Sequence, residues 1–338
     1  MTPTRAGARS PETADGVLAE LLERRLLFVA GKGGTGKSTL AGALALVAAR
    51  QDKRVLCIDI DAKGDLAGAL GSPPVGFQPR PVQPGVHVLQ LIPEESLQEY
   101  LQIYYKVPRF ARMTPLARVF DFVATGVPGA REMLVIGKIA FEEKRRERDG
   151  TPAWDLIIVD AAATGHFLPQ IRAARAMLDL VKGGMIRSQV EWIDAILSDP
   201  QRTLLTVCAL PEEMPVVEAL ELSEKARRET RIRVGACFLN RTIPVVLTPR
   251  QRRVLESMGA PEHVDALSER FGGDVGAVVQ GARLSQRLHD NGAAHAKRLR
   301  AGIGAPVVEV PLQVEARPGL ATTRAVASAL MRGEASLS

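Results

Sequence analysis

The chain has 338 residues, of which 46% are hydrophobic, 24% are charged and only 4% are aromatic, and its formal net charge is +6. This composition is typical of a globular protein with a mostly aliphatic core, and the length allows one large domain or two small ones. The small positive excess comes from scattered arginines with few aromatic rings beside them, so direct nucleic-acid binding is not expected.

We predict that residues 1–24 are a disordered N-terminal segment. The first residues of the chain are rich in Ala, Gly, Thr and Pro and lack the compact apolar run of a signal peptide. Residues 25–332 are expected to form a single domain. The longest apolar stretch, Leu40 to Ala49, has only half of the roughly 20 residues that a transmembrane helix needs. We therefore expect a cytoplasmic protein, either free in solution or peripheral at the membrane.

The first predicted strand, Leu26–Ala30, runs directly into a glycine-rich loop that ends in Lys37-Ser38, and a helix is predicted from Ser38 to Arg50. The loop fits the pattern G-x-x-x-x-G-K-[ST], whose backbone N–H groups wrap around phosphate oxygens at a helix N-terminus. We expect ATP with Mg²⁺ here, with Lys37 reaching the β- and γ-phosphates and the Ser38 hydroxyl coordinating the metal ion. The residues expected to bind the nucleotide in this loop are Gly31, Gly33, Gly34, Thr35, Gly36, Lys37, Ser38 and Thr39.

An additional lysine, Lys32, follows the first glycine of this loop. The sequence Gly-Lys-Gly-Gly-x-Gly-Lys-Ser resembles the deviant Walker A loop of an ATPase group that includes ParA, MinD, the nitrogenase iron protein, arsenite-pump ATPases and tail-anchored-protein targeting ATPases. The resemblance implies a dimer in which Lys32 crosses the interface and contacts the partner's ATP, as an arginine finger supplied in trans does. The alternative is an ordinary surface lysine in a loop.

The second predicted strand, Arg54–Asp59, is followed closely by Asp61. An aspartate that leaves a strand beside the P-loop can orient the attacking water, and the resemblance places the family's catalytic aspartate of switch I at Asp61. We expect Asp61 to act in catalysis and to lie at the Mg²⁺ site. For Asp59 two interpretations stay open: a second polar group near Mg²⁺, or a cap for a neighbouring loop.

Two helical stretches, at about 93–150 and 168–200, interrupt the alternation of strands and helices and predict a helical insertion. A further strand is predicted at His87–Leu91 before the first of them. The insertion contains Met113, Met133, Met177 and Met185 among aliphatic residues. Such helices either pack against one another as a core or open into a groove for the apolar helix of a client, for which flexible methionines are suited.

The third main strand, Asp155–Asp160, ends in a carboxylate that we identify as the Walker B aspartate, Asp160, expected to hold the metal ion through a water molecule. The following Ala161-Ala162-Ala163-Thr164-Gly165-His166 resembles switch II of arsenite-pump and tail-anchor targeting ATPases. The resemblance makes Gly165 the hinge whose N–H senses the γ-phosphate. His166 holds the loop or joins the chemistry.

Three more strands are predicted at Thr203–Ala209, Val234–Asn240 and Val307–Val310. The resemblance implies that Asn240 reads the edge of adenine and that the backbone of Pro311 and Leu312 flanks the base. An asparagine that ends a strand is also a common turn residue.

The three cysteines lie in strand-like apolar runs and form no CxxC pair, so we expect them to be buried thiols in a reducing compartment. They are Cys57, Cys208 and Cys237. A shared metalloid site is the alternative.

The alternation of strands and helices predicts an α/β fold, with a mostly parallel sheet covered by helices on both faces and a helical insertion. The resemblance to the arsenite-pump and tail-anchored-protein targeting ATPases covers most of residues 25–330. It implies a homodimer, or a heterodimer with a paralogous ATPase, that handles a hydrophobic protein client or regulates a membrane-protein partner. The alternatives are a ParA- or MinD-like organiser on DNA or membrane, and the ATPase subunit of an anion pump.

Overall fold

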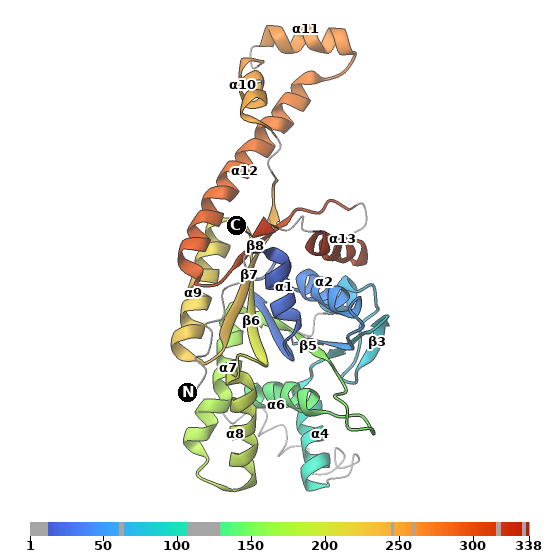
Figure 1. The fold of residues 1–338 in the computed structure, drawn as a ribbon, viewed down its shortest axis with the longest axis vertical. Helices are drawn as coiled ribbons and strands as arrows, with labels where there is room; N and C mark the ends of the chain where they lie inside the picture. The colour runs from blue at the N-terminus through green and yellow to red at the C-terminus, as the bar shows by residue number, and fades with distance from the viewer. Residues whose placement is uncertain are drawn as a thin grey trace, which may run out of the picture.

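A mixed sheet forms the centre of the fold (Figure 1). The computed structural model describes residues 13–60, 64–106, 129–244, 247–258, 261–315, 319–332 and 336–337. Within them, nine strands pair in the order β3-β4-β2-β5-β1-β6-β7-β8-β9. The strands are β1 Leu26–Gly31, β2 Val55–Asp59, β3 Arg80–Gln83, β4 Val86–Gln90, β5 Leu156–Ala163, β6 Thr203–Ala209, β7 Arg233–Thr242, β8 Val307–Pro311 and β9 Ser336–Leu337.

All strands from β4 to β8 in this order run parallel, and the two edge strands, β3 and β9, pair antiparallel. The predicted mostly parallel sheet is therefore confirmed, and each predicted strand is found within a few residues of its expected ends. The two edge strands were not predicted. Because β3 and β9 are short and each borders only one neighbour, neither needs the long apolar run that marks a strand in the sheet centre.

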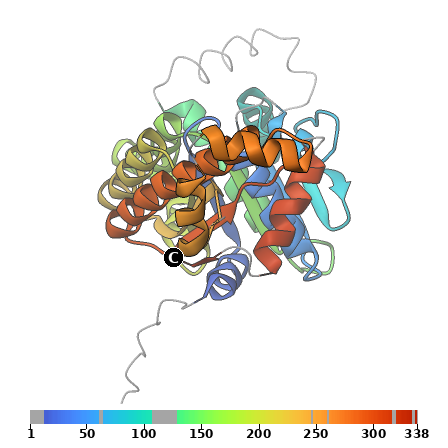
Figure 2. The same ribbon diagram turned by 90° about the horizontal axis from the view of Figure 1, so that it is seen from above.

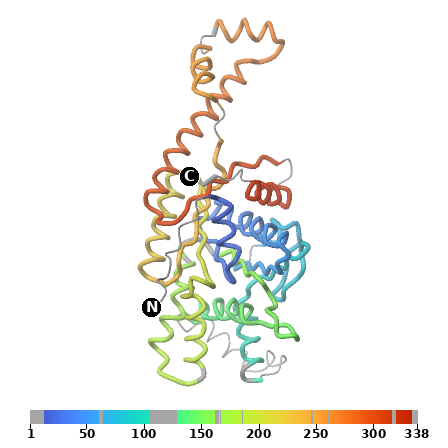
Figure 3. The backbone as a smooth tube through the Cα atoms, viewed as in Figure 1, coloured from blue at the N-terminus to red at the C-terminus, as the bar shows by residue number. Residues whose placement is uncertain are grey.

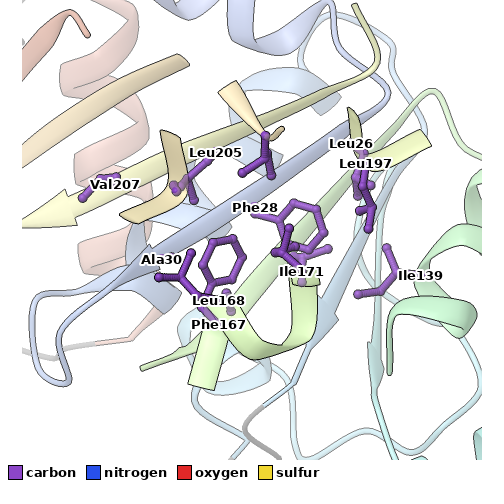
Figure 4. Close-up of a cluster of buried hydrophobic side chains, with 14 of the residues drawn as sticks. Leu26, Phe28, Ala30, Ile139, Phe167, Leu168, Ile171, Leu197, Leu205 and Val207 are labelled. Atoms are coloured by element: carbon purple, nitrogen blue, oxygen red, sulfur yellow. The ribbon is translucent and has the colours of Figure 1, made fainter. Parts of the chain in front are cut away.

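Side chains of β1 alternate between two separate hydrophobic cores, one on each face of the sheet. Leu26 and Phe28 point into the first core and Leu27 and Val29 into the second. Because both faces are covered, every position of the strand is apolar and fully buried. Figure 4 shows the first core, where the ring of Phe28 lies beside that of Phe167 with centroids 5.6 Å apart.

Helices cover both faces of the sheet, as predicted (Figure 2). The second core is covered by α1 Ala14–Leu22, α2 Lys37–Ala49, α3 Asp65–Ala69 and α13 Leu320–Met331. The first core is covered by α6 Ala130–Lys144, α7 Thr164–Leu180, α8 Gly184–Ser198, α9 Glu213–Glu229 and the C-terminal part of α12 Val275–Ile303. None of the described helices is long and apolar enough to cross a bilayer.

Helix α1 corrects the prediction for the N-terminal segment. Thr13 caps it by accepting a hydrogen bond from the N–H of Gly16 at 3.1 Å, and Val17, Leu18, Leu21 and Leu22 are buried. Those four apolar residues recur at helical spacing, so they bury one face against the sheet and offset the entropy of ordering the segment. The predicted disorder over 1–24 is therefore wrong for residues 13–24, and residues 1–12 lie outside the described part.

The predicted helical insertion is present at one end of the molecule. It consists of α4 Pro93–Tyr105 and α6 before β5, and of α7 and α8 after it (Figure 1). Met113 and the rest of 107–128 lie outside the described residues.

A second helical protrusion, which the sequence did not predict, lies at the opposite end (Figure 3). It consists of α10 Pro249–Ser257, α11 Pro261–Phe271 and most of α12, and it connects β7 to β8. We call this protrusion the arm.

Candidate functional site

The P-loop connects β1 to α2, as its pattern predicted. Its backbone takes left-handed conformations at Gly34, with φ +84°, and at Gly36, with φ +92°. Both conformations are strained for any residue with a side chain. Gly36 also has no room for a Cβ, because the Asn240 amide occupies that space, and Gly31 lies against the backbone of Cys208. The glycines of the pattern are thus required by backbone conformation and by close packing.

Hydrogen bonds within the loop fix its shape. Thr35 is 1% exposed, and its hydroxyl donates to the Lys32 carbonyl at 2.9 Å. Its own carbonyl accepts from Asn240 Nδ2 at 2.9 Å and from the Cys208 thiol at 3.4 Å. Lys37 Nζ donates to the same Lys32 carbonyl at 3.3 Å. The loop is therefore braced from β6, which lies beside β1, and from β7, which lies on the far side of β6.

A hollow of about 380 Å³ opens over the loop. It is lined by Gly33, Gly34, Gly36, Lys37, Ser38, Thr39, Asp59, Asp65, Ala69, Asp160, Arg241 and Gly319. A Cβ on Gly33 or Gly34 would meet nothing within 4 Å, so the backbone faces open space there. Free backbone at a helix N-terminus, together with the Lys37 ammonium, is suited to polyphosphate. Of the predicted loop contacts, Gly31 and Thr35 shape the loop from behind, while the others face the hollow.

The residues predicted to hold the metal ion meet at one side of the hollow. The Ser38 hydroxyl donates to Asp160 Oδ2 at 2.5 Å, and Asp160 is 5% exposed. Asp59 lies opposite Asp160 in the register of β2 and β5 and is 4% exposed. Hydroxyl and carboxylate oxygens beside a phosphate cradle are the ligands that Mg²⁺ prefers, so the residues present fit this ion. Asp61, also predicted at this position, lies outside the described residues.

Lys32 points away from the hollow. Its Nζ lies 2.7 Å from Glu218 Oε1 on α9, and the two side chains are 40% and 26% exposed. The P-loop lysine that faces the hollow is Lys37, on the other side of Thr35. Two lysines of one loop therefore have different partners.

Gly165 of switch II is the second residue of α7 and lies near Glu218, the residue that pairs with Lys32. It lines a neighbouring hollow of about 310 Å³ together with Glu218, Glu221 and Arg172, and it does not line the hollow over the P-loop. The side chain of His166 lies outside the described residues. The γ-phosphate contact of Gly165 stays a prediction.

Asn240 is placed beside the nucleotide hollow but points at the P-loop. Its Nδ2 binds the Thr35 carbonyl, its Oδ1 accepts from the Arg241 N–H at 3.0 Å, and it is 8% exposed. Pro311 pairs with Thr242 and the N–H of Leu312 donates to the Thr242 carbonyl at 2.9 Å, so both lie next to the end of β7. Neither lines the hollow. The adenine contacts of Asn240, Pro311 and Leu312 stay predictions.

Sequence reasoning missed three side chains near the nucleotide hollow. Arg241 lines it and has φ +61°, a left-handed conformation that is uncommon outside glycine. Asp65 lines it from the start of α3, and Glu218 holds Lys32. Asp65 and Arg241 stand close in sequence to predicted site residues, which is a usable signal. Glu218 lies inside a helix full of acids, and only the fold selects it.

The three cysteines are buried, as predicted. Burial raises the pKa of the Cys57 and Cys237 thiols far above the ordinary range, and it raises the pKa of Cys208 to about 12. The Cys208 thiol therefore stays protonated and donates to the P-loop. In the described part of the chain, no group of three or more His, Cys, Asp or Glu residues is arranged to hold a metal ion.

The helical insertion contains an apolar pocket of about 270 Å³ between α4, α6, α7 and α8. Met133, Leu134, Met177 and Ile186 are among its lining residues. Its polar border includes Lys138, which is buried and forms ion pairs with Glu99 at 2.6 Å and Glu142 at 2.8 Å. Ile171 packs in the core, while Met133 and Met177 border the pocket. The side chain of Met185 lies outside the described residues. That the pocket receives a client helix stays a prediction.

Comparison with known protein sequences also relates the chain to ATPases. Residues 24–183 match a family described as "Anion-transporting ATPase", and this range contains the P-loop and β5, the strand of Asp160. "ATPase BagA" of Mycobacterium tuberculosis is 33% identical over 253 residues, which cover 73% of each chain.

Two further relatives are more distant or match a shorter stretch. A "Putative arsenical pump-driving ATPase" of Halobacterium salinarum is 28% identical over 286 residues, which cover 76% of this chain and 42% of that protein. "ATPase get3" of Schizosaccharomyces japonicus is 32% identical over 166 residues, which cover 47% of this chain and 48% of that protein.

Proposed function

The chain belongs to the family of anion-transporting ATPases, and on that premise we propose that it works as a dimeric ATP-driven switch in which each subunit supplies Lys32 to the nucleotide of the other. That it hydrolyses ATP follows from the family, which confirms the resemblance seen in the P-loop and switch II. What we propose is the dimer, the action of Lys32 in trans, and the kind of molecule that the switch handles, which we call its load.

Within one subunit, the loop backbone and Lys37 bind the phosphates, and Ser38 with Asp160 would hold Mg²⁺ beside them. The ion, when bound, would neutralise phosphate charge. Asp61 orients a water molecule, which attacks the γ-phosphorus while the bond to the β-γ bridging oxygen breaks. The products are ADP and inorganic phosphate, and the proton of the water passes to the solvent or to phosphate.

The position of Lys32 is the observation that carries the trans mechanism. Its ammonium group lies on Glu218, outside its own hollow, while Lys37 already serves that hollow. A cation that its own site does not use is free to compensate the phosphate charge of a facing subunit, provided that it leaves Glu218. The exchange costs little, because both side chains are partly exposed and such ion pairs contribute only about 0–1 kcal/mol.

A mixing experiment tests the trans lysine. Lys32→Ala and Asp61→Asn chains should each bind ATP and lose most hydrolysis. Trans cations contribute roughly 10³–10⁵-fold to rate, and loss of a water-orienting carboxylate should slow hydrolysis ~10²-fold or more. In a mixed dimer, one of the two sites combines an intact Asp61 with an intact Lys32, so part of the turnover should return on mixing.

Turnover is measured as steady-state phosphate release. Heterodimer formation is measured separately by pull-down of a tagged chain. A mixture that stays inactive although heterodimers form would show that Lys32 does not act in trans. A Lys37→Ala chain is the control, since it should fail to bind ATP in any mixture.

The apolar pocket of the insertion supports a hydrophobic protein segment as the load. It is bordered by methionine and aliphatic side chains of α4, α6, α7 and α8, and α7 begins at switch II. A nucleotide-dependent movement of Gly165 would therefore pass directly into a wall of the pocket. Client handling is thus the version of the switch that the pocket favours over an organiser on DNA or an anion pump.

A further inference from the structure

The arm stands away from the body on a narrow base (Figure 1). At its foot, Ala296, Leu299 and Ile303 of α12 are buried in the first core. Among the described residues of 247–295, Val279 alone is buried. A helical hairpin normally buries an apolar stripe against a neighbour, and the arm has almost no such burial of its own.

Exposed apolar side chains are concentrated on the arm. Of the eleven large hydrophobic residues that are exposed in the described chain, five belong to it. They are Val254, Phe271, Val278, Leu284 and Leu288, each between 49% and 73% exposed. Leaving this apolar surface in water is unfavourable, so the arm is expected to have a partner.

Four positions of α12 form one continuous stripe. Ala277, Gly281, Leu284 and Leu288 are spaced by four, three and four residues, which is the spacing of the contact positions of a coiled coil, and all four are exposed. A Cβ on Gly281 would meet nothing within 4 Å. Ala277, Gly281 and Leu284 of this stripe border an open groove between α10 and α12, so a second helix can approach the α12 backbone closely at Gly281.

The charges of the arm identify the partner. Its stem, residues 249–257 and 280–290, carries five arginines and two acids. Its tip, residues 261–279, carries four acids and one arginine. Two such arms side by side attract one another only when antiparallel, because each tip then lies along the other stem. The net charges of +3 and −3 are equal and opposite, which is the complementarity that a two-fold contact between identical chains requires.

We propose that the arm is a homotypic docking element, whose occupant is the arm of a second copy of this chain in antiparallel orientation. With Gly281 at the crossing, Leu284 of one copy lies opposite Val278 of the other, and Arg287 lies opposite Val275, next to Asp274. This contact goes beyond the ATP switch, since it uses no residue of the nucleotide hollow and needs no nucleotide.

A cross-link tests the geometry directly. Gly281→Cys places a thiol at the two-fold crossing in open space, and the native cysteines are buried and do not compete. Mild oxidation of the full chain without nucleotide should give a disulfide-linked dimer. Gln51→Cys, at an exposed turn between α2 and β2, is the matched control and should stay monomeric on denaturing gels.

Affinity tests the chemistry of the contact. Light scattering on nucleotide-free protein should show a concentration-dependent dimer. The exposed pair Leu284→Glu with Leu288→Glu should raise its Kd about tenfold or more, since two apolar side chains leave the contact. Arg287→Glu should raise it a few-fold, whereas Arg148→Glu, on an exposed turn outside the arm, should not.

Two outcomes would overturn the proposal. The first is a nucleotide-free chain that stays monomeric at tens of micromolar and whose Gly281→Cys variant cross-links no more than the control. The second is a dimer that requires ATP and Lys32 and ignores every arm variant, in which case the proposed ATP switch stands and the arm pairing is wrong. Conversely, if the arms pair but mixing Lys32→Ala with Asp61→Asn chains restores no turnover, only the proposed ATP switch is rejected.

Discussion

At the scale of single residues, the ion pair between Lys32 and Glu218 bears on how the proposed switch is held before ATP binds. The two side chains are 186 positions apart in sequence and meet at 2.7 Å. Glu218 lines the same hollow as Gly165, so the group that holds the lysine lies beside the segment expected to move with the γ-phosphate. In the proposed switch, an ion pair at that position would keep Lys32 in its own subunit until a competing phosphate charge appears.

Glu218→Gln removes the charge that competes for Lys32. We expect the ATP-dependent dimer to form more readily and turnover at limiting protein concentration to rise about two- to fivefold, as loss of a partly exposed ion pair allows. Turnover measured against protein concentration, with light scattering in parallel, checks this. Glu221→Gln, three residues along the same helix and more exposed, is the control. A slower Glu218→Gln enzyme would mean that Glu218 places Lys32 for catalysis.

At the scale of elements, the P-loop and the insertion are joined through β5 and α7. β5 passes the P-loop at Asp160 and ends at Ala163, and α7 follows without a linker and forms one wall of the apolar pocket. Gly137 on α6 leaves that pocket open, since the nearest atom to an added Cβ is Cδ1 of Ile193 at 4.0 Å.

Gly137→Leu is expected to fill the pocket and to abolish most uptake of an apolar ligand while ATP turnover stays within about twofold. The variant should fold, because glycine inside a helix costs about 1 kcal/mol relative to alanine. Fluorescence of an apolar dye and capture of a hydrophobic helical peptide measure uptake. Gly137→Ala, which adds one methyl group, should behave nearly as the parent chain. Unchanged uptake by Gly137→Leu would place the apolar binding surface elsewhere.

At the scale of the whole molecule, a sheet buried on both faces separates two helical extensions at opposite ends (Figure 1). The sheet contains the three buried thiols, whose pKa values are raised by burial. A raised thiol pKa means that the neutral form is favoured in the folded state. This contribution to stability is complete below the unfolded pKa of about 8.5 and is lost as the pH rises from there toward the folded pKa.

The free energy of unfolding should therefore fall above about pH 8.5, with each thiol steepening the decline by about 1.4 kcal/mol per pH unit. Cys57 on β2 is the test position, since it is fully buried. Urea titrations at several pH values between 7 and 10 measure the free energy of unfolding. In Cys57→Ala this free energy should fall less steeply with pH than in the parent chain, whatever the stability of the variant at pH 7. Identical slopes in the two proteins would contradict the assignment of a raised pKa to Cys57.

The sequence by itself determined the features whose chemistry is local. The P-loop needs glycines at Gly34 and Gly36 and a cation at Lys37 within a few positions, so the pattern alone predicted the strand, the loop, the helix and the hollow above them. Buried parallel strands such as β1 and β6 are continuous apolar runs bounded by polar residues, and these were located to within a few residues. Helix α1 was missed, although its apolar spacing was readable, because the composition of the residues before it outweighed that pattern.

Only the tertiary structure decided how distant groups are paired. Asn240, whose contact with adenine stays a prediction, donates to the Thr35 carbonyl, and Glu218 was one acid among several until the fold brought it to Lys32. The arm was missed because its helices have little apolar periodicity directed at a core; their apolar side chains remain exposed. Local sequence specifies backbone conformation and burial over a few turns, whereas a contact between remote side chains depends on where the whole sheet places the ends of its strands.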